Sequence, residues 1–361
     1  MTAAPLARVA YAVALTGAVA WAALIIRAAW TSGTLGFDYL AYDLAVDRLL
    51  AGQTMYDPNV GATGGFGLFF YPPPFALLVL PIALLPQDVA VWAFTLLLVA
   101  ASVAGIALLP VSARVRWIVL LLAALSWPLV YAIKLGQVGP VLLLLFAIGW
   151  RWMERPLALG GSAALGTLIK LQPALLLGWA AVTGRVRAAV VGVLIVALAA
   201  AVATVVAGPQ SWLDEVSLLQ RVSRPIETPH GYGVGRLVFE AGVDAGVATV
   251  LHWANLALVV AVVALVTLRG AAVASYVAVV IATQFVTPVL WDHYALVLLL
   301  PVAWLLEQRH WWAAVIPLLT TTVLVGLNVP WVYPLGFWAA LLGVTWEGLR
   351  LGRSRPTLAP A

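Results

Sequence analysis

Long apolar runs separated by short polar stretches dominate the chain. A transmembrane helix needs about 20 mostly apolar residues, with a lower limit of roughly 17. Runs that reach this length, or that extend toward their neighbours, cover residues 9–30, 88–109, 117–133, 138–150, 157–169, 173–183, 188–207, 250–268, 271–290, 294–306, 311–328 and 334–349. The pattern predicts an all-α polytopic membrane protein of about 11–13 transmembrane helices. These helices would form one integral membrane domain over residues 1–361.

One further apolar run, 72–86, differs from the others because prolines bracket it and because it is short for a span. Broken segments of this kind are tolerated in a membrane where they line a cavity that protein encloses. We therefore expect 72–86 to be a helix that dips in from the outer face without crossing. A short tilted span is the alternative interpretation.

The Lys and Arg residues predict the orientation, because cytoplasmic loops carry an excess of them. With a cytoplasmic N-terminus and a non-crossing 72–86, twelve of the nineteen Lys and Arg residues face the cytoplasm, and eleven of the fourteen acidic residues face outward. This predicts a multi-pass protein of the cell (plasma) membrane. Its longer extracytoplasmic loops would be residues 31–87, with an amphipathic helix and the dipping helix, and residues 208–249.

Composition narrows the possible functions. Apolar residues make up 64% of the chain, charged residues 9%, and cysteine is absent. A soluble domain carries about 25% charged residues, so a soluble fold and nucleic-acid binding are excluded. Thiol chemistry is excluded as well. The inner loops are short and no Gly-rich phosphate loop is present, so we expect any active site to be extracytoplasmic.

The first outer loop carries the clearest candidate for catalysis. Residues 37–52 have helical periodicity, and Gly52 is a typical C-terminal stop. Asp43 and Asp47 would share one face of this helix. Asp38 would lie in its first turn, where the free amides favour a carboxylate. A helix cap for Asp38, and a solvated face for Asp43 and Asp47, are the structural alternatives to a functional role.

Asp38 belongs to a motif of the first loop, and four further motifs come later in the chain. The first loop carries Tyr42, Ala45, Leu49-Leu50, Gly52, Tyr56 and Tyr71-Pro72-Pro73. The later elements are Lys134-Leu135-Gly136-Gln137-Val138, Ile169-Lys170-Leu171-Gln172-Pro173, His230 through Arg236, and Thr287-Pro288-Val289-Leu290-Trp291-Asp292-His293-Tyr294. Their order and spacing resemble those of glycosyltransferase family 87. Gly139 stands where that family commonly has Asn.

The resemblance implies a GT-C-like fold and the transfer of a hexose, typically mannose, from a polyprenyl-phosphate donor to a lipid-linked or cell-envelope glycan acceptor. Asp38 would be the general base of an inverting reaction. The residues expected to bind the donor phosphate or sugar are Lys134, Gln137, Lys170, Arg236, Asp292 and His293. The residues expected at the acceptor or along the lipid groove are Tyr42, Tyr71 and Trp291.

Other interpretations of the same residues stay open at this point. Lys134 and Lys170 could snorkel to the interface, and His293 with Trp291 could belong to an interfacial aromatic belt. No compact ligand spacing suggests a metal site, so we expect neither a metal nor another cofactor. A transporter or flippase is the rival function, and the basic residues of loop 208–249 also suit a ligase for lipid-linked glycans.

Overall fold

The computed structural model describes residues 3–57, 67–321, 327 and 329–353, and in these residues the chain forms helices without a named β-strand. An isolated antiparallel bridge joins Ser126 to Thr321. Together with the long apolar helices described next, this confirms the predicted all-α polytopic membrane class.

Long apolar helices provide the membrane spans. In the part of the chain that the structure describes, four continuous helices are long and apolar enough to cross a bilayer: α1 (Ala3–Thr31), α4 (Gln87–Leu108), α10 (Val186–Ala207) and α13 (Ala245–Arg269). Their outward side chains are large and apolar; Val205 of α10, for example, is 87% exposed. Such a surface is compatible with lipid and unfavourable in water.

A bent helix pair adds a possible fifth span. Helices α6 (Trp127–Leu135) and α7 (Gly139–Arg151) meet at an angle of 118°. Gly136 starts the break with φ +76°, a left-handed conformation that suits glycine. The break leaves Gln137 in the connection between the two helices.

Several apolar helices are shorter than a full span: α3 (Pro73–Ala83), α8 (Pro156–Ile169), the 3-10 turn η1 (Gln172–Ala174) with α9 (Leu175–Val182), and α14 (Ala272–Phe285). The 11 residues of α3 extend about 17 Å at 1.5 Å per residue, roughly half of a 30 Å hydrocarbon core. This length agrees with the dipping helix expected over 72–86. The total of 11–13 crossings stays a prediction.

Three apolar runs fold differently from continuous spans. The run 117–133 divides at Ser126 into α5 (Ala113–Leu125) and α6, because Ser126 is extended and the Trp127 amide donates to the Thr320 carbonyl at 2.8 Å. The runs 294–306 and 311–328 begin as 3-10 turns, and the second lies partly outside the described residues. Their elements are η2 (Asp292–Leu298), α15 (Leu299–Glu307), η3 (Trp311–Ala314) and α16 (Val315–Leu318), and α18 (Val332–Arg353) follows.

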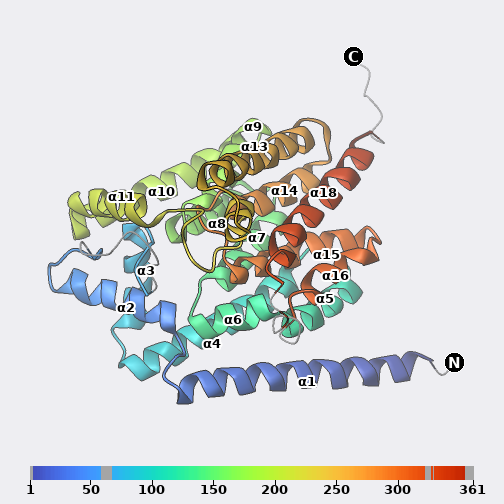
Figure 1. Ribbon diagram of the computed structural model, residues 1–361, viewed down its shortest axis with the longest axis horizontal. Helices are drawn as coiled ribbons and strands as arrows, with labels where there is room; N and C mark the ends of the chain where they lie inside the picture. Colours follow the sequence, from blue (N-terminus) through green and yellow to red (C-terminus); the bar gives the residue numbers. More distant parts are fainter. Residues whose placement is uncertain (1–2, 58–66, 322–326, 328, 354–361) are drawn as a thin grey trace.

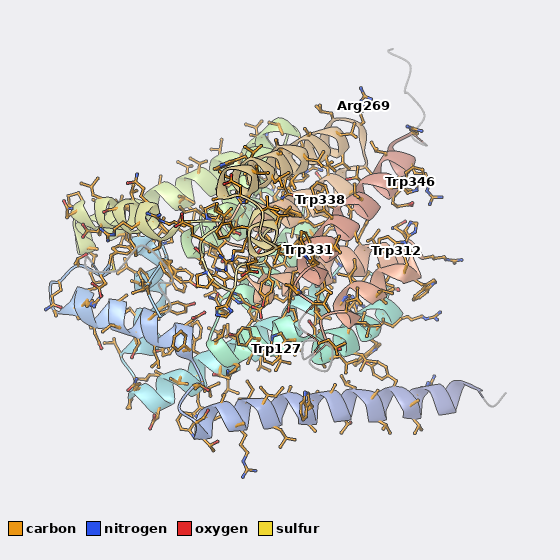
Figure 2. All side chains as sticks on the ribbon, in the orientation of Figure 1. Trp127, Arg269, Trp312, Trp331, Trp338 and Trp346 are labelled. Carbon is orange, nitrogen blue, oxygen red and sulfur yellow. The ribbon has the colours of Figure 1, made fainter. Side chains whose placement is uncertain are left out.

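The two predicted outer loops lie at the same end of the molecule. The first contains α2 (Phe37–Leu50) and α3, and the second contains α11 (Gln210–Val222) and α12 (Val234–Glu240). Figure 1 shows α2 and α11 at one end and both chain termini at the other. Arg269, which the charge pattern assigns to the cytoplasmic side, lies toward the termini (Figure 2).

Helix α14 forms the centre of the bundle. Every residue from Ala274 to Phe285 is buried. α13, α18, α9, α15 and α7 all contact it. This central packing carries the segment 287–294, which follows α14, to the wall of a large cavity.

Candidate active site

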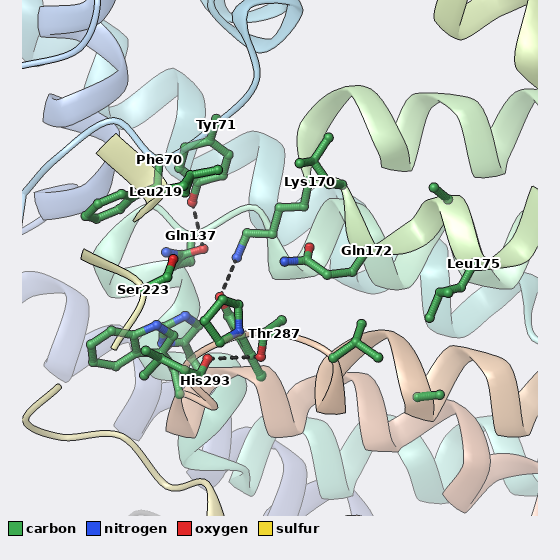
Figure 3. A pocket seen from close by; sticks show the side chains of 18 of the residues that line it. Phe70, Tyr71, Gln137, Lys170, Gln172, Leu175, Leu219, Ser223, Thr287 and His293 are labelled. Atoms are coloured by element: carbon green, nitrogen blue, oxygen red, sulfur yellow. Dashed lines mark hydrogen bonds between the residues drawn. The ribbon is translucent and has the colours of Figure 1, made fainter. Parts of the chain in front are cut away.

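A cavity of about 1480 Å³ opens between the two loops predicted to lie outside and the helix ends beside them. Its wall collects residues from segments far apart in the sequence: the start of α2, the α6–α7 break, the residues after α8, and the segment before η2. Eight of the ten expected site residues line it, namely Asp38, Tyr42, Tyr71, Gln137, Lys170, Trp291, Asp292 and His293. Figure 3 shows Tyr71, Gln137, Lys170 and His293 around the same space.

Two glycines allow α2 to approach the α6–α7 break closely. Gly36 has φ +76° and its amide donates to the Lys134 carbonyl at 2.8 Å. At Gly136 a Cβ atom would lie 2.8 Å from the Cβ of Tyr39, which is closer than carbon atoms approach. The start of α2, with Asp38 in its first turn, is thereby packed against Gln137. Gly36, and not Asp38, occupies the N-cap position, so the capping role considered for Asp38 is not observed.

Asp38 is anchored by a row of hydrogen bonds. Gln137 Nε2 donates to Asp38 Oδ2. Tyr71 Oη donates to Gln137 Oε1 at 3.2 Å, and the hydroxyls of Tyr42 and Tyr71 lie 2.7 Å apart. Tyr56 Oη donates to the Tyr71 carbonyl at 2.8 Å. One oxygen of the Asp38 carboxylate, Oδ2, is therefore hydrogen-bonded to the protein at the cavity wall.

The pKa of Asp38 reflects opposing influences. Burial raises the pKa above its ordinary value of 3.8, because a charged carboxylate loses hydration. His293, the Gln137 hydrogen bond and Lys170 act in the opposite direction. A carboxylate with a raised pKa is a stronger base than a solvated one, which suits a group that must accept a proton from a hydroxyl.

Lys170 supplies a cation at the cavity wall, with its Nζ 5.6 Å from the centre of the Tyr71 ring. Its Nζ donates to Tyr294 Oη at 3.1 Å and lies 4.3 Å from the centre of the Tyr294 ring. Among the described residues, none of the ion pairs with a carboxylate includes Lys170. A cation held by neutral aromatic groups keeps its charge available for an anionic ligand.

His293 and Asp292 form a second polar group. His293 is 5% exposed, and neither ring nitrogen has a hydrogen-bond partner in the described part of the chain. Its Nδ1 lies 3.4 Å from Asp292 Oδ1. Asp292 accepts from Trp127 Nε1 at 3.3 Å and from the His293 amide at 2.7 Å. Buried polar atoms without a partner are costly, so the His293 ring is suited to bind a polar ligand.

Lys134 and Arg236 do not line this cavity. Lys134 Nζ lies 5.6 Å from the centre of the Tyr131 ring. Arg236 pairs with Glu240 and also donates to the Ile226 carbonyl at 2.9 Å. Arg236 therefore braces the second outer loop, and the structure does not bring these two cations together with Lys170.

Sequence reasoning missed several residues of the wall. Tyr131 and Tyr232 line the cavity beside Asp292, and Tyr294 holds Lys170. Tyr294 ends the motif of residues 287–294 named in the sequence, but the motif gave it no separate role. The apolar lining from α9, α13 and α14 gave no signal, because apolar residues are common along the whole chain. Among the described residues, no group of three or more His, Asp or Glu is arranged to hold a metal ion.

A comparison with protein families decides the class. The family model described as glycosyltransferase family 87 matches residues 69–291, more than half of the chain. The chain belongs to glycosyltransferase family 87. The match includes Tyr71, Gln137, Lys170 and Trp291, and Asp38 precedes it. No curated protein and no solved structure matches the chain.

Membership of family 87 makes this protein a membrane glycosyltransferase, and it sets aside the transporter and flippase interpretations. A transferase of this family needs a sugar donor and a glycan acceptor. The cavity holds a cation, the half-buried Asp38 carboxylate and an imidazole without a hydrogen-bond partner among the described residues. It is the candidate for the place where the two substrates meet.

Proposed function

We propose that this family 87 enzyme transfers a hexose, with mannose as the sugar to test first, from a polyprenyl-phosphate donor to a lipid-linked or cell-envelope glycan on the extracytoplasmic face. The observation that carries this proposal is the two-part character of the cavity. Charged and hydrogen-bonding groups line one part, and apolar side chains line the other. An amphiphilic donor has the same division between its phosphate-linked sugar and its lipid chain.

The apolar part of the cavity suits a long hydrocarbon chain. It is lined from α9, α13 and α14 by residues that include Leu175, Gly178, Val263, Leu268 and Val279. Figure 3 shows Leu175 lying away from the polar cluster. A nucleotide-sugar donor would leave this space unfilled, which favours the lipid-linked donor.

Lys170 is suited to stabilise the leaving phosphate. The departing polyprenyl phosphate gains negative charge in the transition state, and a preorganised cation in a site that excludes water stabilises such charge strongly. Lys170 has no carboxylate to neutralise it among the described ion pairs, and Tyr294 holds its Nζ at the cavity wall. His293, whose ring nitrogens have no hydrogen-bond partner among the described residues, would contact the phosphate or the transferred sugar.

Asp38 is suited to act as the general base. An acceptor hydroxyl has a pKa far above neutrality, so its attack on the anomeric carbon is helped by a positioned carboxylate that takes its proton. In a single displacement the acceptor oxygen bonds to the anomeric carbon as the bond to the phosphate oxygen breaks. The configuration therefore inverts, and one carboxylate suffices.

The acceptor glycan would lie against an aromatic surface. Tyr131, Tyr232 and Trp291 line the cavity next to Asp292. Aromatic rings present apolar faces to the C–H faces of sugars, while a carboxylate accepts bonds from sugar hydroxyls. Asp292 Oδ2 accepts from the Trp127 indole and Oδ1 from the His293 amide, and the remaining acceptor capacity of these oxygens would serve a substrate hydroxyl.

The decisive experiment compares donors with the purified enzyme. Polyprenyl-phosphate mannose and a nucleotide-linked mannose are offered with glycolipid acceptors, and the product is analysed by NMR for anomeric configuration. We expect transfer from the lipid donor only, with inversion, and loss of turnover in Asp38→Asn. Transfer from the nucleotide sugar alone would refute the lipid donor, retention would refute single displacement, and an active Asp38→Asn would refute the base.

A further inference from the structure

A row of three buried side chains, Tyr42, Tyr71 and Gln137, lies behind Asp38. Their exposed fractions are 0%, 4% and 8%. The hydrogen bonds run from the Tyr42 and Tyr71 hydroxyls, 2.7 Å apart, through Tyr71 Oη and Gln137 Oε1 at 3.2 Å, to Gln137 Nε2 and Asp38 Oδ2. The Tyr42 ring packs against Phe75, with ring centres 5.0 Å apart. The expected role of Tyr42 and Tyr71 as substrate-contacting residues does not explain this arrangement.

The hydrogen bonds have one direction. A carboxylate only accepts hydrogen bonds, and a Gln side chain donates from its nitrogen and accepts at its oxygen. Tyr71 has a single hydroxyl proton, and it bonds Gln137 Oε1; Tyr42 therefore donates to Tyr71. With Tyr71 donating, the amide nitrogen of Gln137 is turned toward Asp38. Without that donor the amide is free to rotate and present its oxygen, which favours a protonated Asp38.

We propose that Tyr71 is a positioning residue, whose hydroxyl orients the Gln137 amide so that Asp38 keeps Oδ2 bonded to the protein and Oδ1 free for the acceptor hydroxyl. This inference rests on the proposed role of Asp38 as the general base. Tyr42 completes the row by donating to Tyr71, which leaves the one proton of Tyr71 for Gln137.

The row acts together with the other groups around Asp38. The titratable and charged groups that face it from the neighbouring elements are Lys170, His293, Tyr42, Tyr71 and Tyr131. Burial raises the pKa of Asp38, and the Gln137 donation opposes that rise. If Gln137 donates a weaker hydrogen bond, the pKa of Asp38 rises further. Asp38 is then protonated at a higher pH than in the wild-type protein.

The test is the pH dependence of kcat/KM in Tyr71→Phe and in Gln137→Leu. A hydrogen bond to a charged acceptor is worth about 1.5–3 kcal/mol, and one pKa unit corresponds to 1.36 kcal/mol. We expect the acid limb to move up by about one to two pH units in Gln137→Leu and by about half as much in Tyr71→Phe. Because Tyr71 acts through Gln137, the double variant is expected to match Gln137→Leu alone.

Tyr276→Phe is the matched control. The hydroxyl of Tyr276 is buried in α14 and donates to the Phe146 carbonyl at 2.8 Å. Its removal deletes a buried hydrogen bond of the same kind away from Asp38, so we expect lower stability with an unmoved acid limb. An unmoved limb in Tyr71→Phe, or equal shifts that add in the double variant, would overturn the proposal.

A second measurement separates this inference from the proposed function. The infrared band of a protonated carboxyl group, assigned by its loss in Asp38→Asn, reports the pKa of Asp38 without any substrate. A higher pKa in Tyr71→Phe, in a protein that transfers no sugar, would support the role of Tyr71 and refute the glycosyl transfer. An unchanged pKa in a protein that transfers sugar would refute the role of Tyr71 alone.

Discussion

Glu215 allows a quantitative prediction about stability and pH. It lies on α11 of the second outer loop and is 4% exposed. Its Oε1 is buried and has no hydrogen-bond partner among the described residues. Burial raises the pKa of Glu215 from 4.5 to about 7, because the charged form loses its hydration without gaining a cation. We therefore expect Glu215→Gln, which keeps the shape and removes the charge, to stabilise the protein at high pH.

The magnitude follows from the two pKa values. Between pH 4.5 and about 7 the folded protein holds a proton on Glu215 that the unfolded chain releases. The contribution to stability is thus complete below pH 4.5, falls as the pH rises through this interval, and levels off above about 7. At 1.36 kcal/mol per pKa unit, the difference between the two pKa values corresponds to about 3 kcal/mol. Gln does not titrate, so the variant lacks this loss.

The assay is thermal unfolding of the detergent-solubilised protein from pH 4.5 to pH 8.5. We expect the Tm of wild type to fall by several degrees more than that of Glu215→Gln across this range. Glu227→Gln is the control, because the Glu227 side chain is 46% exposed and pairs with Arg224. If the Tm curves of wild type and Glu215→Gln stayed parallel from pH 5 to pH 8, the reasoning about the buried carboxyl would be wrong.

Three further predictions concern the active site and the topology. Lys170→Met should lower kcat/KM for the lipid donor by about a thousandfold, since a charge pair at 4 Å and an effective dielectric constant of 20 is worth about 4 kcal/mol. Lys170→Arg keeps the charge and should retain part of the rate. Equal losses in both variants would contradict a purely electrostatic role. Gly178→Leu should raise KM for long-chain donors, because a Cβ at Gly178 meets no atom within 4 Å and the side chain would enter the apolar lining. Gly17→Leu on α1 is the control. An unchanged KM in Gly178→Leu would mean that the lipid chain of the donor does not occupy this space. Gln87→Cys, a single cysteine in a cysteine-free chain, should react with a membrane-impermeant reagent from the extracytoplasmic side, whereas labelling only from the cytoplasm would mean that 72–86 crosses.

For Arg236 and Lys134, the motif order and the neighbouring residues on the same helix suggest different partners. The motif order suggested that both cations bind the donor. Glu240 stands four residues after Arg236, a spacing that pairs side chains on a helix, and the structure contains that pair. Tyr131 stands three residues before Lys134 and lies beneath its ammonium group. In both cases a nearby partner on the same helix was visible in the sequence, and neither residue lines the cavity.

The apolar runs could not predict where helices break. A span is recognised by its total hydrophobicity, and the run 117–133 is apolar throughout. Ser126 interrupts it through backbone pairing with residues 320–321, which lie far along the chain. The length of α3, in contrast, agreed with expectation, because prolines at both ends of the run 72–86 limit a helix locally.

The sequence by itself determined the environment and the chemistry of this protein. Low charge and long apolar runs require lipid, because the chain has too few polar groups to cover itself in water, and the positions of the scarce polar motifs indicated family 87. The tertiary structure decided which of those polar residues meet. Asp38 and Gln137 share one cavity wall because Gly36 and Gly136 let α2 approach the α6–α7 break, and the end of α8 brings Lys170 to the same cavity. Contacts of this kind depend on backbone approach between distant segments, and no local pattern of residues encodes them.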